Sequence, residues 1–389
     1  MTNLIVKPME SDSEEAALCD LATQAFNFSE DRWEKFPQIV GRENIRVAIN
    51  NDKVVGGMSF YPVAQWFGGQ SMPMAAIALV LTGVEHRGKG FANGMLKTVM
   101  EELRNSGCPL ATLYPSTQPV YRKLGFEQAG NNYTYTTKLS DIRGVQKKCA
   151  VRRADLETDR QLLQTLASKY ASANNGCLER NDGMWKRLFR DIHGKVYIYV
   201  MGESGDERGY LIYDQSPDRI IEVRDMVALD GDAQQTVWSV IASNRSIMEA
   251  VRWTGPSNDL RGLCIQEHRS RVEFPRRWML RLLDVRDALL RRGYPKLTGQ
   301  LTLEVADDLF AENTGNFTLS LERGTPNVEQ SVVSSPLRIT VHDLAPLYSG
   351  LWTATQLRDA GRLTCDDEDT IELANQFFAG SEPWMSDAF

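Results

Sequence analysis

The sequence has 389 residues, of which 42% are hydrophobic and 24% charged, the composition of an ordinary globular protein rather than of a disordered chain. At roughly 100 to 200 residues per domain, this length predicts two to four domains. The formal net charge of −7 gives a field that repels phosphate backbones and attracts cations, so we expect no nucleic-acid partner.

Export and membrane insertion are not expected. The first eight residues lack the apolar run of a secretory signal, and no run of about 18 apolar residues predicts a membrane span. The six cysteines and four histidines stand singly along the chain. This pattern predicts free thiols in a reducing cytoplasm, with neither a disulfide framework nor a metal site.

A first zone, to about residue 145, alternates helix and strand patterns. Asp12 and Ser13 are candidate N-caps of a first helix, whose apolar residues recur at helical spacing. Strands are then predicted over residues 45–49, 54–60 and 75–82. The last of these is apolar on both alternating faces, as expected of a central strand covered on both sides. A helix follows from Phe91 and ends before Gly107.

A second zone opens near Cys149 with a strand and a helix that resemble the first ones. A shift of 145 positions pairs Val6, Leu18, Leu21 and Ala22 with Val151, Leu163, Leu166 and Ala167. Four matches of common residues leave open both a true repeat and a chance similarity. Strands over 196–200, 209–213 and 220–229 and a helix over 233–243 complete this zone.

The third zone begins with a predicted helix over residues 278–292, stopped by Gly293 and Pro295. Beyond it, strands are predicted over 300–305, 316–322 and 337–341, and helices over 343–348, 354–360 and 371–378.

The segment from Val84 to Ala92 is the most informative part of the chain. It contains two glycines between the buried strand and the amphipathic helix, so successive amide N–H groups and a helix N-terminus would form a concave site for a pyrophosphate. Arg87 and Lys89 would strengthen that site. A plain strand-to-helix turn with solvated basic residues is the alternative. The spacing Arg-x-x-Gly-x-Ala resembles the acetyl-CoA pyrophosphate loop of the GNAT N-acetyltransferases.

A second motif follows in the order that those enzymes use. Tyr121 to Phe126 reproduces Tyr-x-x-x-Gly-Phe, after a strand over 109–115 and within a short helix over 118–123. Two motifs in the right order are more specific than either alone. With a second GNAT-like zone that lacks its own loop, a final sheet-and-helix zone and Phe389 at the end of the sequence, the whole chain resembles the Eis (enhanced intracellular survival) family.

The resemblance implies the architecture. It implies an α/β (α+β) fold with tandem GNAT folds, the second degenerate, followed by a sterol carrier protein-like α+β domain. We expect these domains over residues 1–145, 146–290 and 291–389. It also implies a homo-hexamer, and we expect the degenerate second domain to bind no coenzyme A.

The resemblance also implies the cofactor contacts. The backbones of Val80, Leu81 and Thr82 would bind the pantetheine arm of acetyl-CoA. The pyrophosphate would lie against Arg87, Gly88, Lys89, Gly90, Phe91, Ala92 and Asn93, and Ser116 and Thr117 would touch the cofactor before the catalytic tyrosine.

Two residues take catalytic roles by the same resemblance. Tyr121 would be the general acid, because a phenol with a pKa near 10 can protonate a departing thiolate whose parent thiol has a pKa near 8.5. A tyrosine that only packs is the alternative. The α-carboxylate of Phe389 would be the base; the alternative is a frayed tail without function. Pro383, Trp384 and Met385 are apolar enough to dock, and Asp387 or Glu382 would be the next candidate base.

The resulting expectation is an acetyl-CoA-dependent N-acetyltransferase, without a metal, acting on a small cationic amine or a lysyl amine. Aminoglycosides, polyamines and lysine side chains are the acceptor classes. The alternatives are a lipid or acyl-CoA carrier with a non-catalytic GNAT unit, and an enzyme that uses another acyl-CoA. The complete loop from Arg87 to Ala92 and the presence of Tyr121 favour the enzyme, because a carrier has no use for either.

Overall fold

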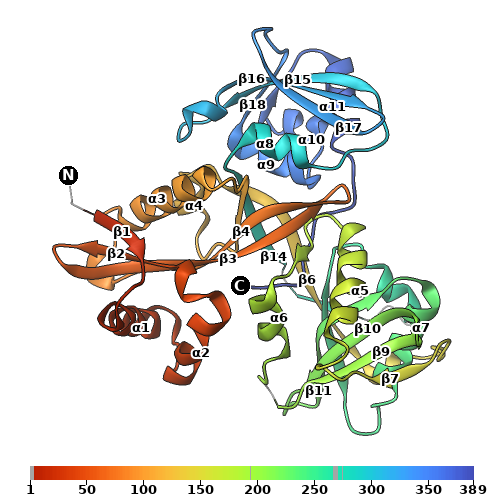
Figure 1. The fold of residues 1–389 in the computed structure, drawn as a ribbon. Coiled ribbons are helices and arrows are strands. Elements are labelled where there is room, and N and C mark those ends of the chain that lie inside the picture. The colour runs from red at the N-terminus through yellow and green to blue at the C-terminus, as the bar shows by residue number, and fades with distance from the viewer. Residues whose placement is uncertain (1–3, 193, 266–269, 274) are drawn as a thin grey trace.

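The structure, a computed structural model, describes residues 4–192, 194–265, 270–273 and 275–389. Figure 1 shows three lobes, coloured red to orange, yellow-green to green, and cyan to blue. Within the described residues, the first two lobes share one sheet of 14 strands, and the third has a five-stranded sheet of its own. None of the described helices is long and apolar enough to cross a membrane.

The first lobe begins with two helices packed beside a twisted antiparallel sheet. Its elements are β1 (Leu4–Pro8), α1 (Asp12–Phe26), α2 (Glu30–Val40), β2 (Ile45–Asn50), β3 (Lys53–Phe67), β4 (Gln70–Thr82), α3 (Phe91–Asn105), β5 (Leu110–Leu113), α4 (Gln118–Arg122) and β6 (Glu127–Lys138). Strands β1 to β4 are antiparallel neighbours, and β5 returns parallel to β4 after α3. The predicted strands and the helix from Phe91 are confirmed.

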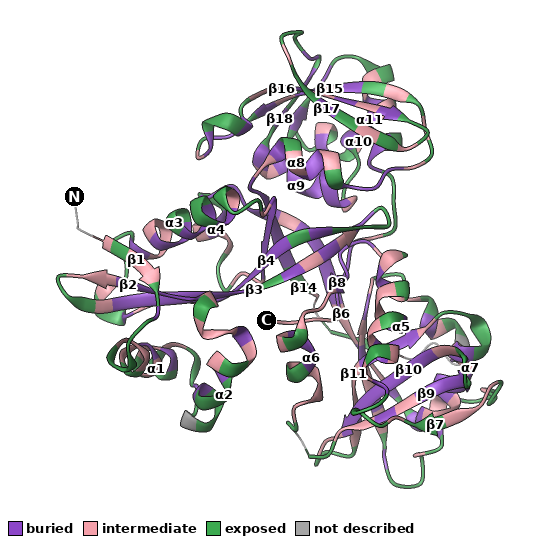
Figure 2. Ribbon diagram, in the orientation of Figure 1, coloured by how far each residue is buried: buried purple, intermediate pink, exposed green. Residues whose placement is uncertain are grey.

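Strand β4 is covered on both faces, as its apolar run predicts. Met74 and Ala76 belong to the core under α1, whereas Ala75 and Ile77 pack with the buried face of α3. Figure 2 shows the resulting concentration of buried residues on the central strands. The first helix is capped one residue earlier than expected: Ser11, not Asp12 or Ser13, accepts the Glu14 amide and completes a capping box.

The second lobe repeats the topology of the first. Its elements are β7 (Val151–Arg153), α5 (Arg160–Ser172), β8 (Leu178–Glu179), α6 (Asp182–Phe189), β9 (Tyr197–Glu203), β10 (Asp206–Gln215), β11 (Ile220–Ala228), α7 (Gly231–Ala242), β12 (Ala250–Gly255), β13 (Arg271–Val272) and β14 (Arg276–Leu282). Antiparallel strands β7, β9, β10 and β11 are followed by α7 and by β12, which is parallel to β11. In the first lobe, β4, α3 and β5 follow one another in the same way, and β5 is parallel to β4.

The two lobes complete each other's sheets at their junction. The first half of β6 pairs with β14, whereas its second half, from Tyr133, pairs with β12 of the second lobe. In turn, β14 lies between β5 and β6 of the first lobe. The sheet is therefore continuous across the expected boundary at residues 145 and 146, and the three expected domain ranges stay predictions.

The helix predicted over residues 278–292 is wrong for its first half. Residues Arg276–Leu282 form strand β14, and the helix, α8 (Val285–Arg291), begins only after its N-cap Asp284. Trp278, Met279 and Leu280 are all buried, because neighbouring strands and both faces enclose β14. A short apolar run of this kind has no alternation that would distinguish a central strand from a buried helix.

The third lobe is a sheet covered by helices. Besides α8, its elements are β15 (Gly299–Ala306), β16 (Gly315–Glu322), β17 (Thr325–Ser331), β18 (Leu337–Thr340), α9 (Val341–Ser349), α10 (Ala354–Asp359), β19 (Leu363–Thr364) and α11 (Glu368–Phe377). The strand order is β17, β16, β15, β18, β19. After α11 the chain leaves this lobe, and Figure 1 shows its end at the centre, between α6, β3 and β14.

Candidate active site

Strands β4 and β5 part in the middle of the first lobe. Their parallel pairing ends at Ile77 and Leu113, but β4 continues to Thr82 with β3 as its partner. At the point of parting, Leu79 has a φ of 52° and the register against β3 shifts, which is a β-bulge. A non-glycine residue at positive φ costs on the order of 1 to 3 kcal/mol and persists where the surroundings enforce it, often at a functional site.

The parted edge of β4 suits an extended ligand. The predicted contacts Val80, Leu81 and Thr82 lie on this stretch, and none of the described strands pairs with its β5-facing edge. A pantetheine arm could therefore add to β4 as an extra strand does, through backbone hydrogen bonds. The side chain of Leu81 is buried in the core, so only its backbone groups are available to bind the pantetheine arm.

The loop after β4 has the backbone that a pyrophosphate requires. Gly88 and Gly90 have φ values of 76° and 84°, which disfavour other residues, and a Cβ at either would meet nothing within 4 Å. Gly90 is the N-cap of α3 and supplies no side-chain cap. The first helical bond runs from the Gly94 amide to the Gly90 carbonyl, which leaves the preceding amides without helical partners. Arg87 and Lys89 are exposed beside them.

The predicted loop residues thus lie together around one anion-binding helix N-terminus, and they fit acetyl-CoA. Phe91 can contribute to the pyrophosphate site only through its backbone, because its ring is buried in the core between α3 and the sheet. Ala92 and Asn93 are half-buried in the first turn.

The corresponding place in the second lobe is different. Helix α7 is capped by Asp230, whose carboxylate accepts the Ala233 amide at 2.8 Å. A carboxylate already occupies this helix N-terminus and would repel a phosphate. This contrast supports the expectation that the second lobe binds no coenzyme A, which stays a prediction.

The Tyr-x-x-x-Gly-Phe motif folds as a tight turn after α4. The Phe126 amide donates to the Tyr121 carbonyl at 3.2 Å, and the two rings pack edge to face with centroids 6.2 Å apart. Gly125 has a φ of 87°, and a Cβ there would lie 2.6 Å from the guanidinium of Arg281 on β14. Only glycine satisfies both constraints, so the motif glycine is needed for the junction with β14.

The Tyr121 hydroxyl lies in a protected environment. The residue is 5% exposed, and burial raises its pKa above the ordinary value, while the nearby Ser116 hydroxyl acts in the opposite direction. The phenol therefore holds its proton at neutral pH and can act as an acid. Ser116 and Thr117 are exposed at the start of α4.

The C-terminal segment docks between the lobes rather than fraying. The Asn131 amide donates to the Pro383 carbonyl at 3.2 Å, and the Trp384 amide donates to the Asn175 carbonyl at 2.9 Å. Closer to the end, the Tyr114 hydroxyl donates to the Asp387 carbonyl at 3.0 Å. The Phe389 ring packs on the Tyr114 ring, with centroids 5.5 Å apart.

A buried arginine fixes this segment from the second lobe. Arg180 donates to the carboxylates of Asp387 at 2.7 Å and Asp225 at 2.6 Å, and to the Ser386 hydroxyl at 2.9 Å. The flanking carboxylates raise the pKa of Arg180 well above its usual value despite burial. Asp387 is thus an ion-pair partner, and Glu382 accepts from the Ser257 amide and hydroxyl. Neither the Asp387 nor the Glu382 carboxylate lines either of the two surface hollows that Phe389 borders.

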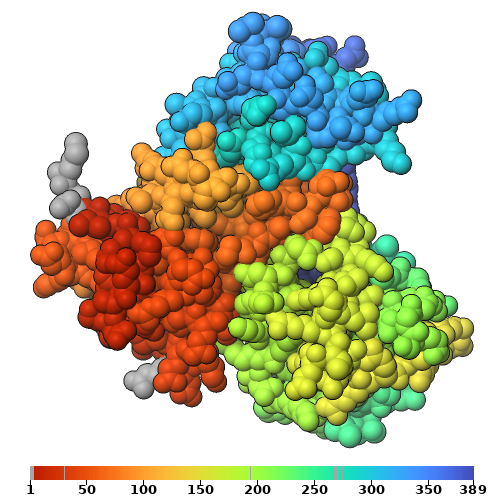
Figure 3. Space-filling model, in the orientation of Figure 1, coloured from red at the N-terminus to blue at the C-terminus, as the bar shows by residue number. Residues whose placement is uncertain are grey.

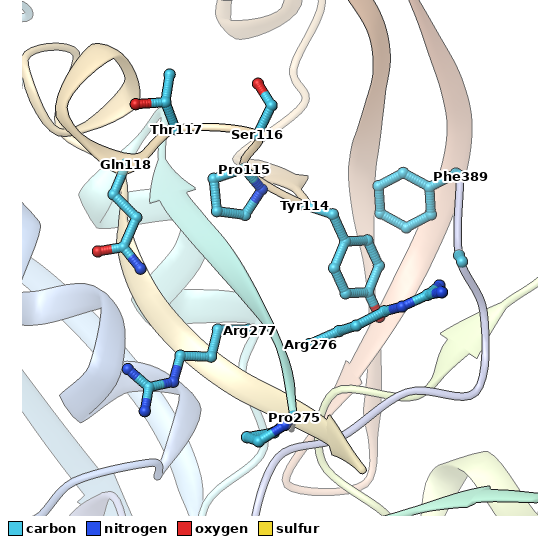
Figure 4. Close-up of a pocket in the computed structure, with 10 residues that line it drawn as sticks. Tyr114, Pro115, Ser116, Thr117, Gln118, Pro275, Arg276, Arg277 and Phe389 are labelled. Carbon is cyan, nitrogen blue, oxygen red and sulfur yellow. The ribbon is translucent and has the colours of Figure 1, made fainter. Parts of the chain in front are cut away.

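Phe389 lies between two hollows of the described surface. The first, about 530 Å³, is lined by Tyr114, Pro115, Ser116, Thr117, Gln118, Pro275, Arg276, Arg277, Ala388 and Phe389. Figure 4 shows the rings of Tyr114 and Phe389 on one side, with Ser116 and Thr117 across from them. Tyr121 does not line this hollow, but its neighbour Ser116 does.

The second hollow, about 140 Å³, lies between α2, α6 and the bulge of β4. It is lined by Phe26, Phe28, Arg32, Phe36, Ile39, Tyr61, Ala78, Leu79, Arg187, Arg190 and Phe389. Figure 3 shows dark-blue atoms of the C-terminal segment at the junction of the first two lobes. The sequence did not indicate Arg180, Tyr114 or these pocket arginines, since they come from segments far apart that only the tertiary fold unites.

Comparisons with known proteins agree with this geometry. Two family models, each described as an acetyltransferase (GNAT) domain, match residues 6–129 and 176–282. The crystal structure of a GCN5-related N-acetyltransferase from Anabaena variabilis superposes with a TM-score of 0.95 at 33% identity, covering 100% of both chains. The chain is a GCN5-related N-acetyltransferase.

Other relatives of the acetyltransferase place it near the Eis proteins. It is 26% identical over 350 residues to an uncharacterized N-acetyltransferase of Streptomyces griseus, covering 83% of each chain. It is 22% identical over 332 residues to the N-acetyltransferase Eis of Mycobacterium tuberculosis, covering 80% of this chain and 79% of the relative. The resemblance to the Eis family is confirmed.

The expected fold class of the acetyltransferase is also confirmed. A model described as a sterol carrier protein domain matches residues 285–386, after the two GNAT matches. The chain is thus an enzyme built from two GNAT domains and a sterol carrier protein-like domain, and acetyl-CoA is its co-substrate.

Proposed function

We propose that this acetyltransferase transfers the acetyl group of acetyl-CoA to a primary amine held beside Phe389. The observation that carries the proposal is the docked terminus. Phe389 lies between two hollows, one of which reaches Ser116 and the start of α4, the helix that carries Tyr121. When bound, acetyl-CoA supplies an acetyl group activated as a thioester. The backbone edge from Val80 to Thr82 and the loop from Arg87 to Asn93, with Ser116 and Thr117, would hold it.

Two groups of the chain would move the protons of the reaction. A C–N bond forms as the C–S bond breaks, so the amine must lose a proton and the departing thiolate must gain one. We assign the first proton to the terminal carboxylate of Phe389, directly or through water, and the second to the Tyr121 hydroxyl. The raised pKa of Tyr121 supports its role as the acid, because the phenol remains protonated while the amine reacts.

The acceptor classes to test are aminoglycosides, polyamines and lysine side chains. The test is release of coenzyme A thiol from acetyl-CoA with one member of each class, together with the mass of the N-acetylated product. The proposal requires acceptor-dependent thiol release and a product that is heavier by one or more acetyl groups. Acetyl-CoA binding without transfer to any amine would contradict it.

We also propose a cytoplasmic homo-hexamer. Cys108, Cys149, Cys177 and Cys365 are free thiols, which suits a reducing compartment. Leu260 and Leu263 of the short helix Leu260–Cys264 are 73% and 69% exposed, an apolar surface that a neighbouring subunit could cover. Light scattering should give about six times the chain mass of 43.8 kDa, and a mass of one chain would refute assembly.

A further inference from the structure

The second hollow beside Phe389 is small and is lined by aromatic side chains and arginines. Rings of Phe26, Phe28, Phe36 and Tyr61 form its walls, and the bulged strand β4 closes it with Ala78 and Leu79. Its volume of about 140 Å³ is smaller than the roughly 300 to 1,000 Å³ of drug-sized ligand sites. Because the hollow is lined by Ala78 and Leu79 at the bulge, it adjoins the edge of β4 from Val80 to Thr82 where the pantetheine arm is proposed to bind.

Three arginines surround this small site without carboxylate partners. Arg32 comes from the first turn of α2, and Arg187 and Arg190 come from the C-terminal end of α6, which packs against α2. Among the described side chains, none of their guanidinium groups lies within 4.0 Å of a carboxylate. The position of Arg32 is unfavourable in addition, because the positive end of the α2 dipole repels a cation there.

The arginines repel one another. Burial, followed by the charges of Arg190 and Arg187, lowers the pKa of Arg32. Burial, followed by the charges of Arg187 and Arg224, lowers the pKa of Arg190. Arg224 itself is paired with the buried carboxylate of Asp214. The positive charge at the hollow therefore belongs to the three arginines that line it, and Phe389, which lines it too, brings its α-carboxylate.

A buried hydroxyl of the same wall also lacks a partner. Tyr61 is 0% exposed, and its hydroxyl forms no hydrogen bond with any described group. A buried polar group without a partner costs stability, which a ligand accepting its hydrogen bond would restore. The Tyr61 hydroxyl and the three guanidinium groups are all donors, and the guanidinium of Arg32 also lies 3.8 Å over the Phe28 ring. An anion is the kind of ligand that could accept hydrogen bonds from all of these groups.

We propose that Arg32, Arg187, Arg190 and Tyr61 form an anion subsite, so that the acceptor is a small apolar amine that also carries a carboxylate or phosphate. The aromatic wall binds the apolar body, the arginines bind the anion, and the amine is thereby directed toward Phe389. This inference rests on the proposed transfer to an amine beside Phe389. It disfavours polyamines and aminoglycosides, whose several positive charges the three arginines would repel.

Matched pairs of acceptors test the subsite. L-Phenylalanine and phenethylamine differ by a carboxylate, and O-phosphoethanolamine and ethanolamine differ by a phosphate, with spermidine as the polycation. We expect the anionic member of one pair to have at least about a tenfold higher kcat/KM, the size that one charge-assisted hydrogen bond supports. The pair that discriminates identifies the anion. Equal or better turnover of spermidine and of the partners that lack the anionic group would overturn the proposal.

Variants locate the discrimination. Arg32→Gln and Arg190→Gln should raise KM for the anionic acceptor about tenfold or more and leave KM for the partner that lacks the anionic group unchanged. Tyr61→Phe should act in the same direction. Arg245→Gln, on the exposed surface after α7, is the matched control and should change neither. An acceptor preference that survives both pocket substitutions would also overturn the assignment.

Binding separates this proposal from the proposed activity. Calorimetry with 3-phenylpropionate and its uncharged amide, and with phenyl phosphate and phenol, measures the subsite without turnover. Anion-selective binding that Arg190→Gln abolishes would support the subsite even if no amine were acetylated, in which case only the proposed activity fails. Equal binding of the charged and uncharged ligands would refute the subsite whatever the activity.

Discussion

A tyrosine can protonate a departing thiolate only while it holds its own proton. Burial of Tyr121 raises its pKa above the ordinary value of a tyrosine, and the Ser116 hydroxyl limits that rise, so the protonated form dominates at neutral pH. The alkaline loss of activity that belongs to Tyr121 should therefore lie above the ordinary pKa of a tyrosine, and the pH dependence of kcat measures it.

Removing the Tyr121 hydroxyl should slow the reaction without weakening the binding of acetyl-CoA. In Tyr121→Phe the ring still packs on Phe126, but the proton donor is lost, so kcat should fall by roughly 10² to 10⁴. Thiol release at saturating substrates measures kcat, and calorimetry measures acetyl-CoA affinity, which should stay nearly unchanged. Tyr199→Phe in the second lobe is the control. A fall of less than about threefold with chemistry limiting would make Tyr121 structural.

Gly90 is expected to be essential for cofactor binding for two reasons that can be separated. Its φ of 84° disfavours any side chain, and its position at the N-terminus of α3 would bring a carboxylate against the pyrophosphate. Gly90→Glu should therefore weaken acetyl-CoA binding by on the order of 100-fold or more, as a repulsion of a few kcal/mol implies.

Gly107 provides the matched control for this substitution. It follows the other end of α3, has a φ of 80° and also has no neighbour within 4 Å of a Cβ. Gly107→Glu thus imposes the same strain and charge away from the loop, and its acetyl-CoA affinity by calorimetry should match that of the unaltered protein. Equal affinities of both folded variants would remove the pyrophosphate from this loop.

The individual elements divide into those that the sequence could predict and those that only the tertiary structure decides. Helix α3 was predictable, because its apolar residues repeat at helical spacing and Gly107 follows its end. Strand β14 was not, since an apolar run enclosed on both faces carries no period of two. The glycines of the loop could be recognised because they lie in one segment of the sequence. The grouping of the arginines of α2 and α6 could not be recognised, because only the tertiary fold brings the two helices together.

The terminal segment is an element without regular structure, and Arg180 is the cation that holds it from the second lobe. Arg180→Met would leave the buried carboxylates of Asp225 and Asp387 without their cation, a change that typically costs about 3 to 5 kcal/mol. We expect a lower melting temperature and faster hydrogen exchange over residues 381–389. Because small displacements of a reacting group cost on the order of 100-fold in rate, kcat should fall comparably.

The exposed pair of Arg160 and Asp182 is the control for that experiment. Their atoms lie 2.8 Å apart, but the side chains are 39% and 77% exposed, so Arg160→Met should change stability by no more than about 1 kcal/mol. If the Arg180 variant keeps full kcat while its terminal segment exchanges faster, the position of the terminus does not matter for catalysis.

At the scale of the whole molecule, the site depends on all three lobes. The first lobe supplies the parted strands and the loop, the second supplies β14 and Arg180, and the third sends the chain back to the centre. The third lobe also contacts the segment around α4, which carries Tyr121. Glu127 accepts hydrogen bonds from both Arg122 of α4 and Arg362 of the third lobe. A base at the terminus is thus positioned by contacts distributed over the entire chain.

A main-chain carboxylate that acts as the base cannot tolerate displacement, and this gives the most direct test. One glycine added after Phe389 keeps every side chain but moves the charge by up to about 3.5 Å, beyond hydrogen-bond reach of the amine or its water. Thiol release should fall steeply in this variant and in one that lacks Phe389, which also loses the ring packed on Tyr114. Acetyl-CoA affinity should remain, because the loop and the β4 edge are unaltered. Full turnover of the glycine-extended protein with the same amine would exclude the Phe389 carboxylate. Asp387 is already paired with Arg180 and Glu382 already accepts from Ser257, so either would have to leave its partner to replace Phe389 as the base.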